Sequence, residues 1–130
     1  MRAGLSKAYS GAAWIVFALT LLQFFLAGLG LFGTSGFGAH ESVGYTLHAI
    51  TVIVFLLAIA GPRNGRDIGM GFALAVIATI QVSLPGLRDD APVIAAFHPL
   101  VALLILGLSA HIGRRYLGPP SARGSEAATV

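Results

Sequence analysis

Apolar residues in this chain form four long runs, and the short segments between the runs carry most of its charged and turn-forming residues. A helix needs about 20 residues to cross a bilayer, at a rise of about 1.5 Å per residue. The pattern predicts such helices over about residues 11–32, 39–60, 68–84 and 93–112. The expected fold is therefore an all-α, up-and-down bundle of four transmembrane helices.

Turn-forming residues separate these runs. The first run ends in a glycine-rich loop over residues 33–38, the second ends at Gly61-Pro62, and the third ends at Pro85-Gly86. Within the fourth run, Pro99 cannot donate a backbone hydrogen bond to the carbonyl of Ala95, so we expect the helix to bend there.

Composition narrows the class of protein. Of the 130 residues, 56% are hydrophobic and only 10% are charged, against about 25% charged in soluble domains. Cysteine is absent, which excludes disulfides and thiolate sites. The basic residues lie at the ends of apolar runs instead of forming a patch, so nucleic acid is not an expected partner. We expect residues 1–117 to form the transmembrane domain and residues 118–130 a disordered cytoplasmic tail.

The distribution of basic residues predicts the orientation. In the expected bundle only Arg88 lies on one side, and the other side carries Arg2, Lys7, Arg63, Arg66, Arg114, Arg115 and Arg123. Lysine and arginine favour the cytoplasmic side of short loops. The sequence thus predicts a multi-pass protein of the plasma (inner) membrane with both termini in the cytoplasm.

A polar constellation interrupts the second and fourth apolar runs. Ionisable groups are costly at membrane depth, so they usually face the protein interior and often mark a site. Unrolled at about 100° per residue, the second helix places its polar residues and Gly44 on one arc. That arc comprises His40, Glu41, Gly44, Tyr45, His48 and Thr51. Gly44 would allow a flat group or another helix to approach closely.

The fourth helix carries His98 on the same face as a seam of small residues, Ala95, Ala102 and Ser109. His48 would lie about 12 Å below the start of its helix and His98 about 9 Å below Pro92, at about 1.5 Å per residue. We therefore expect the second and fourth helices to be in contact through the His48 and His98 faces. Gln23 and Gln81 would add polar groups to the same outer half of the bundle.

Each of these residues also has a purely structural interpretation. Glu41 suits a helix N-terminus, Tyr45 an aromatic belt, and His40 the headgroup level. Gln23 and Gln81 suit interhelical hydrogen bonds. His111 lies at the inner end beside Arg114-Arg115, where an interfacial position is expected. His48 and His98 are harder to explain in this way, because two buried histidines at one level need partners.

The pattern resembles a family of short, uncharacterised bacterial four-helix membrane proteins over about residues 8–115. The resemblance rests on four features: the histidine-rich start of the second helix (His40 to His48), Gln81 near the end of the third, His98-Pro99 at the start of the fourth, and the basic pair Arg114-Arg115 that ends it. A looser similarity is to membrane b-type cytochromes, in which histidines of two helices hold a haem. That similarity implies His48 and His98 as iron ligands, with His40 in reserve. Gly44 would make room, and Arg88 would pair with a propionate. His111 has no partner, so one haem at most is implied.

Three hypotheses for function follow. The first is a single bis-histidine haem b site for electron transfer, with a membrane redox complex or a second copy of the chain as partner. The second is an apo site for a proton, a metal ion or a quinone-like ligand. The third is a structural or accessory membrane subunit. No motif of a soluble enzyme is present, so we do not expect enzymatic activity from this chain on its own.

Overall fold

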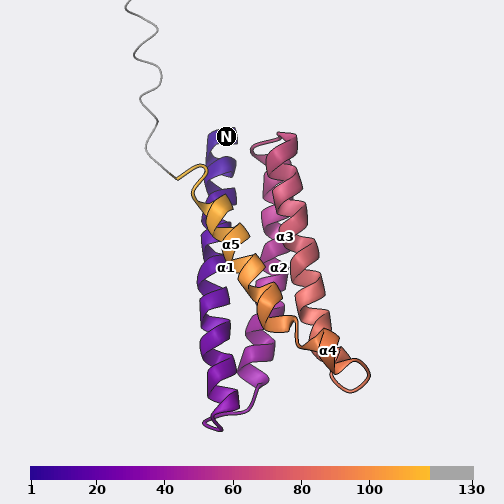
Figure 1. Ribbon diagram of the computed structural model, residues 1–130. Helices are drawn as coiled ribbons and strands as arrows, with labels where there is room; N and C mark the ends of the chain where they lie inside the picture. Colours follow the sequence, from indigo (N-terminus) through magenta and orange to yellow (C-terminus); the bar gives the residue numbers. More distant parts are fainter. Residues whose placement is uncertain (118–130) are drawn as a thin grey trace, which may run out of the picture.

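The computed structural model describes residues 1–117 and is all-helical there (Figure 1). Its elements are α1 (Arg2–Leu31), α2 (Gly38–Ala60), α3 (Gly65–Ser83), the 3₁₀ turn η1 (Leu84–Leu87), α4 (Pro92–Ala95) and α5 (His98–Gly113). The tail expected over residues 118–130 lies outside the described residues.

Four segments are long and apolar enough to cross a membrane, within the part of the chain that the structure describes. They are Arg2–Leu31, Gly38–Ala60, Gly65–Leu87 and Pro92–Gly113. The prediction of an all-α fold with four helices that could span a membrane is confirmed. Helix α1 begins nine residues earlier than expected, and this added stretch includes Tyr9 and Ser10, which are fully buried.

The fourth span is broken where proline predicts a bend. Helix α4 ends at Ala95, the chain turns at Ala96 and Phe97, and α5 begins at His98. Pro99 has no backbone N–H to offer the carbonyl of Ala95, and its ring would clash with that carbonyl in a continuous helix. The predicted bend is confirmed, and the break puts His98 in the first turn of a new helix.

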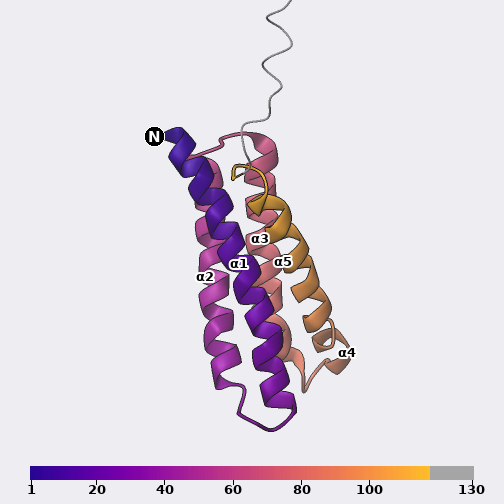
Figure 2. The same cartoon turned by 90° about the vertical axis from the view of Figure 1, so that its left-hand side faces the viewer.

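The four spans form a closed ring (Figures 1 and 2). Helix α1 packs against α2 and α5, and α3 packs against the same two helices. Helices α2 and α5 therefore lie diagonally opposite each other. The expected close seam between these two helices is wrong: Ala102 and Ser109 are buried, but against the bundle centre and the two neighbours of α5.

The core is narrow and made largely of small or β-branched residues, such as Ala13, Val54 and Ala78. Large apolar side chains including Phe25, Leu56 and Leu104 point outward and are exposed, as suits a surface that faces lipid. Small residues let membrane helices approach closely. The turn after α2 approaches the start of α1 closely, because a Cβ added to Gly61 would lie 2.8 Å from the backbone carbonyl carbon of Leu5.

Candidate functional site

A cavity of about 830 Å³ lies at the end of the bundle where α1 ends and α2 begins. We call this the histidine end. Eight of the nine predicted site residues line the cavity: Gln23, His40, Glu41, Gly44, Tyr45, Gln81, Arg88 and His98. The ninth, His48, is not among the lining residues. The predicted site residues therefore gather around one cavity, apart from His48, which lies elsewhere.

His40 is held by Gln23 of the preceding helix. Its Nδ1 lies 3.1 Å from the backbone carbonyl oxygen of Gln23, and the Gln23 side-chain amide donates to the carbonyl of His40 at 2.9 Å. A carbonyl oxygen can only accept, so the ring of neutral His40 carries its hydrogen on Nδ1. Its Nε2 is then a free lone pair, with no hydrogen bond to any residue that the structure describes.

His98 is held by Gln81 in the same way. Its Nδ1 donates to the backbone carbonyl of Gln81 at 3.0 Å, which again leaves the lone pair on Nε2. The Gln81 side-chain amide lies 3.2 Å from that Nε2 and donates to it. The amide oxygens of Gln23 and Gln81 are both buried, and neither has a hydrogen-bond partner among residues 1–117.

The two imidazoles meet across the cavity. Their ring centres lie 6.0 Å apart, and the ring planes are inclined at 63°. Of the two neighbours expected for Gly44, a flat group or another helix, the structure shows the helix: a Cβ at this position would lie 2.8 Å from the amide nitrogen of Gln23 on α1. The missing side chain makes room for Gln23, and through Gln23 it supports the position of His40.

The structure corrects the expected pairing of His48 with His98. His48 Nε2 lies 3.0 Å from the hydroxyl of Thr79 on α3. That hydroxyl already donates to the carbonyl of Ala75, so it accepts from His48, whose hydrogen is on Nε2. His48 follows His40 by eight residues, which is a turn of about 80° around the helix and a descent of about 12 Å. His48 thus lies about two turns deeper in the bundle than His40, where its ring meets Thr79 of α3.

Other predicted residues lie at the rim or outside. Tyr45 lines the cavity but is 57% exposed, and the Arg88 side chain, 79% exposed, pairs with Asp89 at 3.5 Å. His111 is exposed near the end of α5, as its interfacial interpretation implies. No group of three or more His, Cys, Asp and Glu side chains that could hold a metal ion occurs within residues 1–117.

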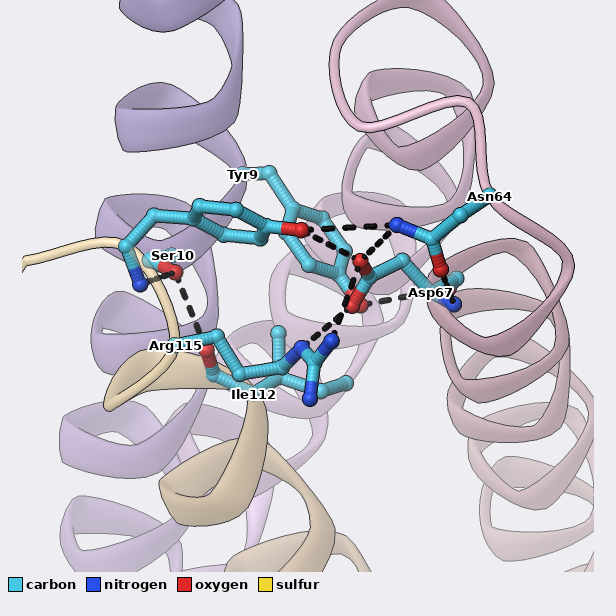
Figure 3. A network of polar contacts seen from close by, with 7 residues as sticks. Tyr9, Ser10, Asn64, Asp67, Ile112 and Arg115 are labelled. Carbon is cyan, nitrogen blue, oxygen red and sulfur yellow. Dashed lines mark hydrogen bonds and ion pairs between the residues drawn. The ribbon is translucent and has the colours of Figure 1, made fainter. Parts of the chain in front are cut away.

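A second polar cluster at the opposite end was not predicted (Figure 3). Its centre is Asp67 in the first turn of α3, which is fully buried and forms an ion pair with Arg115. The Tyr116 hydroxyl donates to Asp67 Oδ2 at 2.6 Å, and the Asn64 side chain contacts the same oxygen. We call this the aspartate end.

The cluster ties three parts of the chain together. The Tyr9 hydroxyl of α1 donates to the backbone carbonyl of Asp67 at 3.2 Å, and Ser10 accepts from the backbone N–H of Tyr116 at 3.2 Å. Burial, reinforced by the hydrogen bond to the Asp67 carboxylate, raises the pKa of Tyr116. The sequence did contain a hint, since Asn64 and Asp67 have the spacing of a helix cap. Nothing in the sequence paired Asp67 with a residue 48 positions later.

A family model described as "Family of unknown function (DUF6220)" matches residues 23–86 of this chain. The matched segment begins at Gln23, includes α2 and α3, and ends within η1. Neither the curated proteins nor the solved structures contain a match to this chain. The chain is thus similar to an uncharacterised family, which supports that part of the expected resemblance.

Proposed function

We propose that this membrane protein binds one haem b, with His40 and His98 as axial ligands. The observation that supports it is the arrangement of the two imidazoles: each donates Nδ1–H to a backbone carbonyl, and each carries its lone pair on Nε2. Nε2 of His40 has no partner among residues 1–117, and Nε2 of His98 accepts from the Gln81 amide. Histidines that bind a metal nearly always donate their other N–H to a carbonyl, carboxylate or water, which fixes the ring and its tautomer. This proposal replaces His48 by His40.

The distance between the rings suits such a pair. Two metal–nitrogen bonds of about 2 Å each, with the span from each nitrogen to its own ring centre, separate the ring centres of an axial pair by about 6 Å. The observed separation is 6.0 Å. A bare metal ion would want further protein ligands, and residues 1–117 supply no third His, Cys, Asp or Glu for it. Haem brings its four equatorial ligands with it.

The protein groups around the histidines also fit. Gln81 now donates to His98 Nε2, and on ligation this amide would be released toward the cavity. Arg88 at the rim is a cation suited to a propionate, although its present partner is Asp89. A bound haem would supply one-electron redox chemistry. The chain's own contribution is to orient two imidazoles and to keep them in an apolar surrounding.

An absorption spectrum tests the proposal. The full-length protein is expressed with haem available, purified in detergent and compared with His40→Ala, His98→Ala and His48→Ala. We expect a Soret band and the split α and β bands of low-spin haem in the wild type. Either cavity substitution should abolish the low-spin spectrum. His48→Ala is the matched control and should keep it, because His48 is bonded to Thr79.

Two results would reject the haem site. One is a colourless wild-type protein when haem was supplied. The other is an unchanged low-spin spectrum in His40→Ala or His98→Ala. If all four proteins are colourless but equally stable, the layer of histidines and glutamines acts as interhelical support, and the accessory-subunit hypothesis stands instead.

We propose a hydrogen-bonding amphipathic ligand such as a quinol as the second candidate. The supporting observation is that three acceptors beside the cavity have no hydrogen-bond partner among residues 1–117: the amide oxygens of Gln23 and Gln81, and Nε2 of His40. A hydroxyl group could donate to His40 Nε2 directly, and to the buried amide oxygens once those side chains turn toward the cavity. Binding of a quinol analogue that requires His40, in protein without a Soret band, would favour this candidate over haem.

We also propose that both termini lie in the cytoplasm, so that the histidine end faces outward. The support is the placement of Arg2, Arg63 and Arg114 at one end of the bundle and Arg88 at the other. The chain has no native cysteine, so Ser35→Cys and Gly65→Cys each introduce a single label site. A membrane-impermeant thiol reagent added to intact cells should label the first and not the second; the reverse pattern would invert the orientation.

A further inference from the structure

The two halves of the bundle repeat each other at an offset of 58 residues, the separation between Tyr9 and Asp67. Every buried residue of α3 stands 58 positions after a buried residue of α1. These pairs are Tyr9 and Asp67, Ala13 and Gly71, Val16 and Leu74, and Thr20 and Ala78. Three buried residues of α2 recur in α5 at the same offset: Leu47 and Ile105, Thr51 and Ser109, and Val54 and Ile112.

The sequence repeats most clearly next to the cavity. Residues 23–29 read Gln-Phe-Phe-Leu-Ala-Gly-Leu, and residues 81–87 read Gln-Val-Ser-Leu-Pro-Gly-Leu. The Gln, the first Leu, the Gly and the last Leu occupy the same positions in both. In each half the histidine follows the glutamine by 17 residues.

The packing of the helices agrees with this repeat. If the α1–α2 hairpin and the α3–α5 hairpin are equivalent, the contact between α2 and α3 must have a counterpart between α5 and α1. Both contacts are present. Figures 1 and 2 show the two hairpins side by side with matching directions. The hairpins are thus related by a pseudo-two-fold axis along the bundle, as in parallel repeats of other membrane proteins. His40 and His98 meet across it.

Three chemical details recur with the repeat. In both hairpins the histidine Nδ1 donates to the backbone carbonyl of the glutamine, and the glutamine amide nitrogen donates to the histidine residue. In both, the amide oxygen is buried and has no partner among residues 1–117. One difference is visible, since Gln23 donates to the backbone of His40 whereas Gln81 donates to the ring of His98. Position 44 also differs from its counterpart: Gly44 corresponds to Ala102.

We infer that the protein consists of two repeated hairpins, each of which contributes one glutamine–histidine unit, and that Gln23 and Gln81 are positioning residues for the histidine of their own hairpin. The consequence for binding rests on the proposed haem site: the ligand lies at the pseudo-two-fold axis and is held by both units alike. The glutamines fix the ring tautomers before any ligand binds.

The histidine tautomers test this inference directly. Full-length protein labelled with ¹⁵N-histidine is prepared without haem, and the ring nitrogens are assigned with the single-histidine variants. We expect His40 and His98 to carry hydrogen on Nδ1 and His48 to carry it on Nε2. Gln81→Leu should move the Nε2 resonance of His98, which loses its donor, and leave His40 unchanged. Gln23→Leu should change the His40 resonances and leave His98 unchanged.

Thr51→Val and Ser109→Ala are the matched controls, because these buried hydroxyls occupy equivalent positions below the cavity and, among residues 1–117, bond to their own helices. They should alter no tautomer. Both glutamine variants keep the backbone carbonyl that accepts from the histidine Nδ1, so both should keep hydrogen on Nδ1. In haem-loaded protein Gln23→Leu should weaken haem binding, because it removes the amide that holds the backbone of His40. Gln81→Leu should not weaken it, because this substitution frees Nε2 of His98. The controls should bind haem as the wild type does.

The outcomes separate the two proposals. Protein that shows the expected tautomers and hairpin-specific shifts but never binds haem supports the repeat and rejects the haem site. Protein that binds haem while His40 and His98 carry hydrogen on different nitrogens rejects the equivalence of the two units. A Gln23→Leu protein that disturbs His98 more than His40 rejects it as well. If a glutamine variant does not fold, the tautomers of His40 and His98 in the wild-type protein still test whether the two units are equivalent.

Discussion

The two ends of this bundle place polar groups in an apolar interior for opposite purposes. At the aspartate end, Asp67 is fully buried and is surrounded by Arg115, Tyr116 and Asn64, which hold its carboxylate. At the histidine end, a cavity remains between the helices, and buried amide oxygens lack partners within the described chain. Asp67 Oδ1 and Arg115 Nε make no hydrogen bond within the described chain either, but they face each other in the ion pair. A polar network whose groups are paired fastens helices together. An unpaired one beside a cavity is consistent with the ligand binding that we propose.

The difference also concerns which elements are joined. The aspartate end connects α1, α3 and the segment after α5, which are far apart in the sequence. The histidine end uses two hairpins that each form their own local unit. We therefore expect substitutions at the aspartate end to act mainly on stability, and those at the histidine end mainly on binding.

The largest effect on stability is expected for Asp67→Ala. It leaves the partly buried Arg115 without its partner and removes the acceptor of two further donors, so we expect a loss of about 3 kcal/mol in the free energy of unfolding, the low end of the range for a broken buried pair. Chemical denaturation in detergent measures it. Asp89→Ala is the control, since its ion pair with Arg88 is exposed and should contribute at most about 1 kcal/mol. Equal losses in both variants would mean that the buried network does not fasten this end.

Tyr116→Phe should have the next largest effect. It removes a hydrogen bond of 2.6 Å to a charged carboxylate, which corresponds to about 1.5–3 kcal/mol. The raised pKa of Tyr116 adds a dependence on pH. A group whose pKa is higher in the folded than in the unfolded state stabilises fully below the unfolded pKa, about 10 for tyrosine, and loses this contribution as pH rises through the folded pKa.

Chemical denaturation at a series of alkaline pH values checks the predicted dependence of stability on pH. The wild type should lose stability relative to Tyr116→Phe as the pH rises above about 10. Tyr45→Phe is the control at an exposed tyrosine and should follow the wild-type curve. A Tyr116→Phe protein with the same alkaline loss as the wild type would show that the phenol of Tyr116 is not the group responsible.

The sequence allowed the histidine end to be predicted better than the aspartate end, for a physical reason. Long apolar runs and terminating glycine and proline residues are local features, so the four spans and the bend before Pro99 could be predicted. Polar residues within an apolar run are equally visible, and eight of the nine named site residues do line one cavity. The cluster around Asp67 is built from residues near the ends of the spans. Charged residues are common there, so their presence did not indicate a buried network.

The error in pairing His48 with His98 arose from counting depth along an unbroken helix. The chain turns at Ala96 and Phe97, so His98 opens α5 much as His40 opens α2. The two histidines at one level are therefore those nearest the helix starts. Periodicity alone could not decide this, because His40 and His48 both fall on a broad polar arc, and only the carbonyl of Gln23 selects His40.

Gly44→Ala sharpens the comparison at the histidine end. The new Cβ would lie 2.8 Å from the Gln23 amide nitrogen and must displace it, which breaks the bond to the His40 carbonyl. We expect a loss of about 1 kcal/mol in stability together with weaker ligand binding. Gly107→Ala is the matched control on α5, because nothing lies within 4 Å of its added Cβ. Unchanged binding in Gly44→Ala would remove Gln23 from the positioning role.

The smallest effect is expected for Thr79→Val, which keeps the shape of the side chain and removes the acceptor of His48 Nε2–H. One neutral, partly exposed hydrogen bond contributes about 0.5–1.5 kcal/mol, so the loss in denaturation free energy should lie at the low end of that range. His48 would then lose its preference for hydrogen on Nε2, and its ¹⁵N resonances should report a mixture of tautomers. The His40 and His98 resonances should stay as they are, because their tautomers are fixed by Gln23 and Gln81 on other helix faces. If Thr79→Val altered the His98 ring or the spectrum of a haem-loaded sample, His48 would belong to the cavity network after all. The division between a histidine that supports the α2–α3 contact and two that serve the cavity would then have to be abandoned.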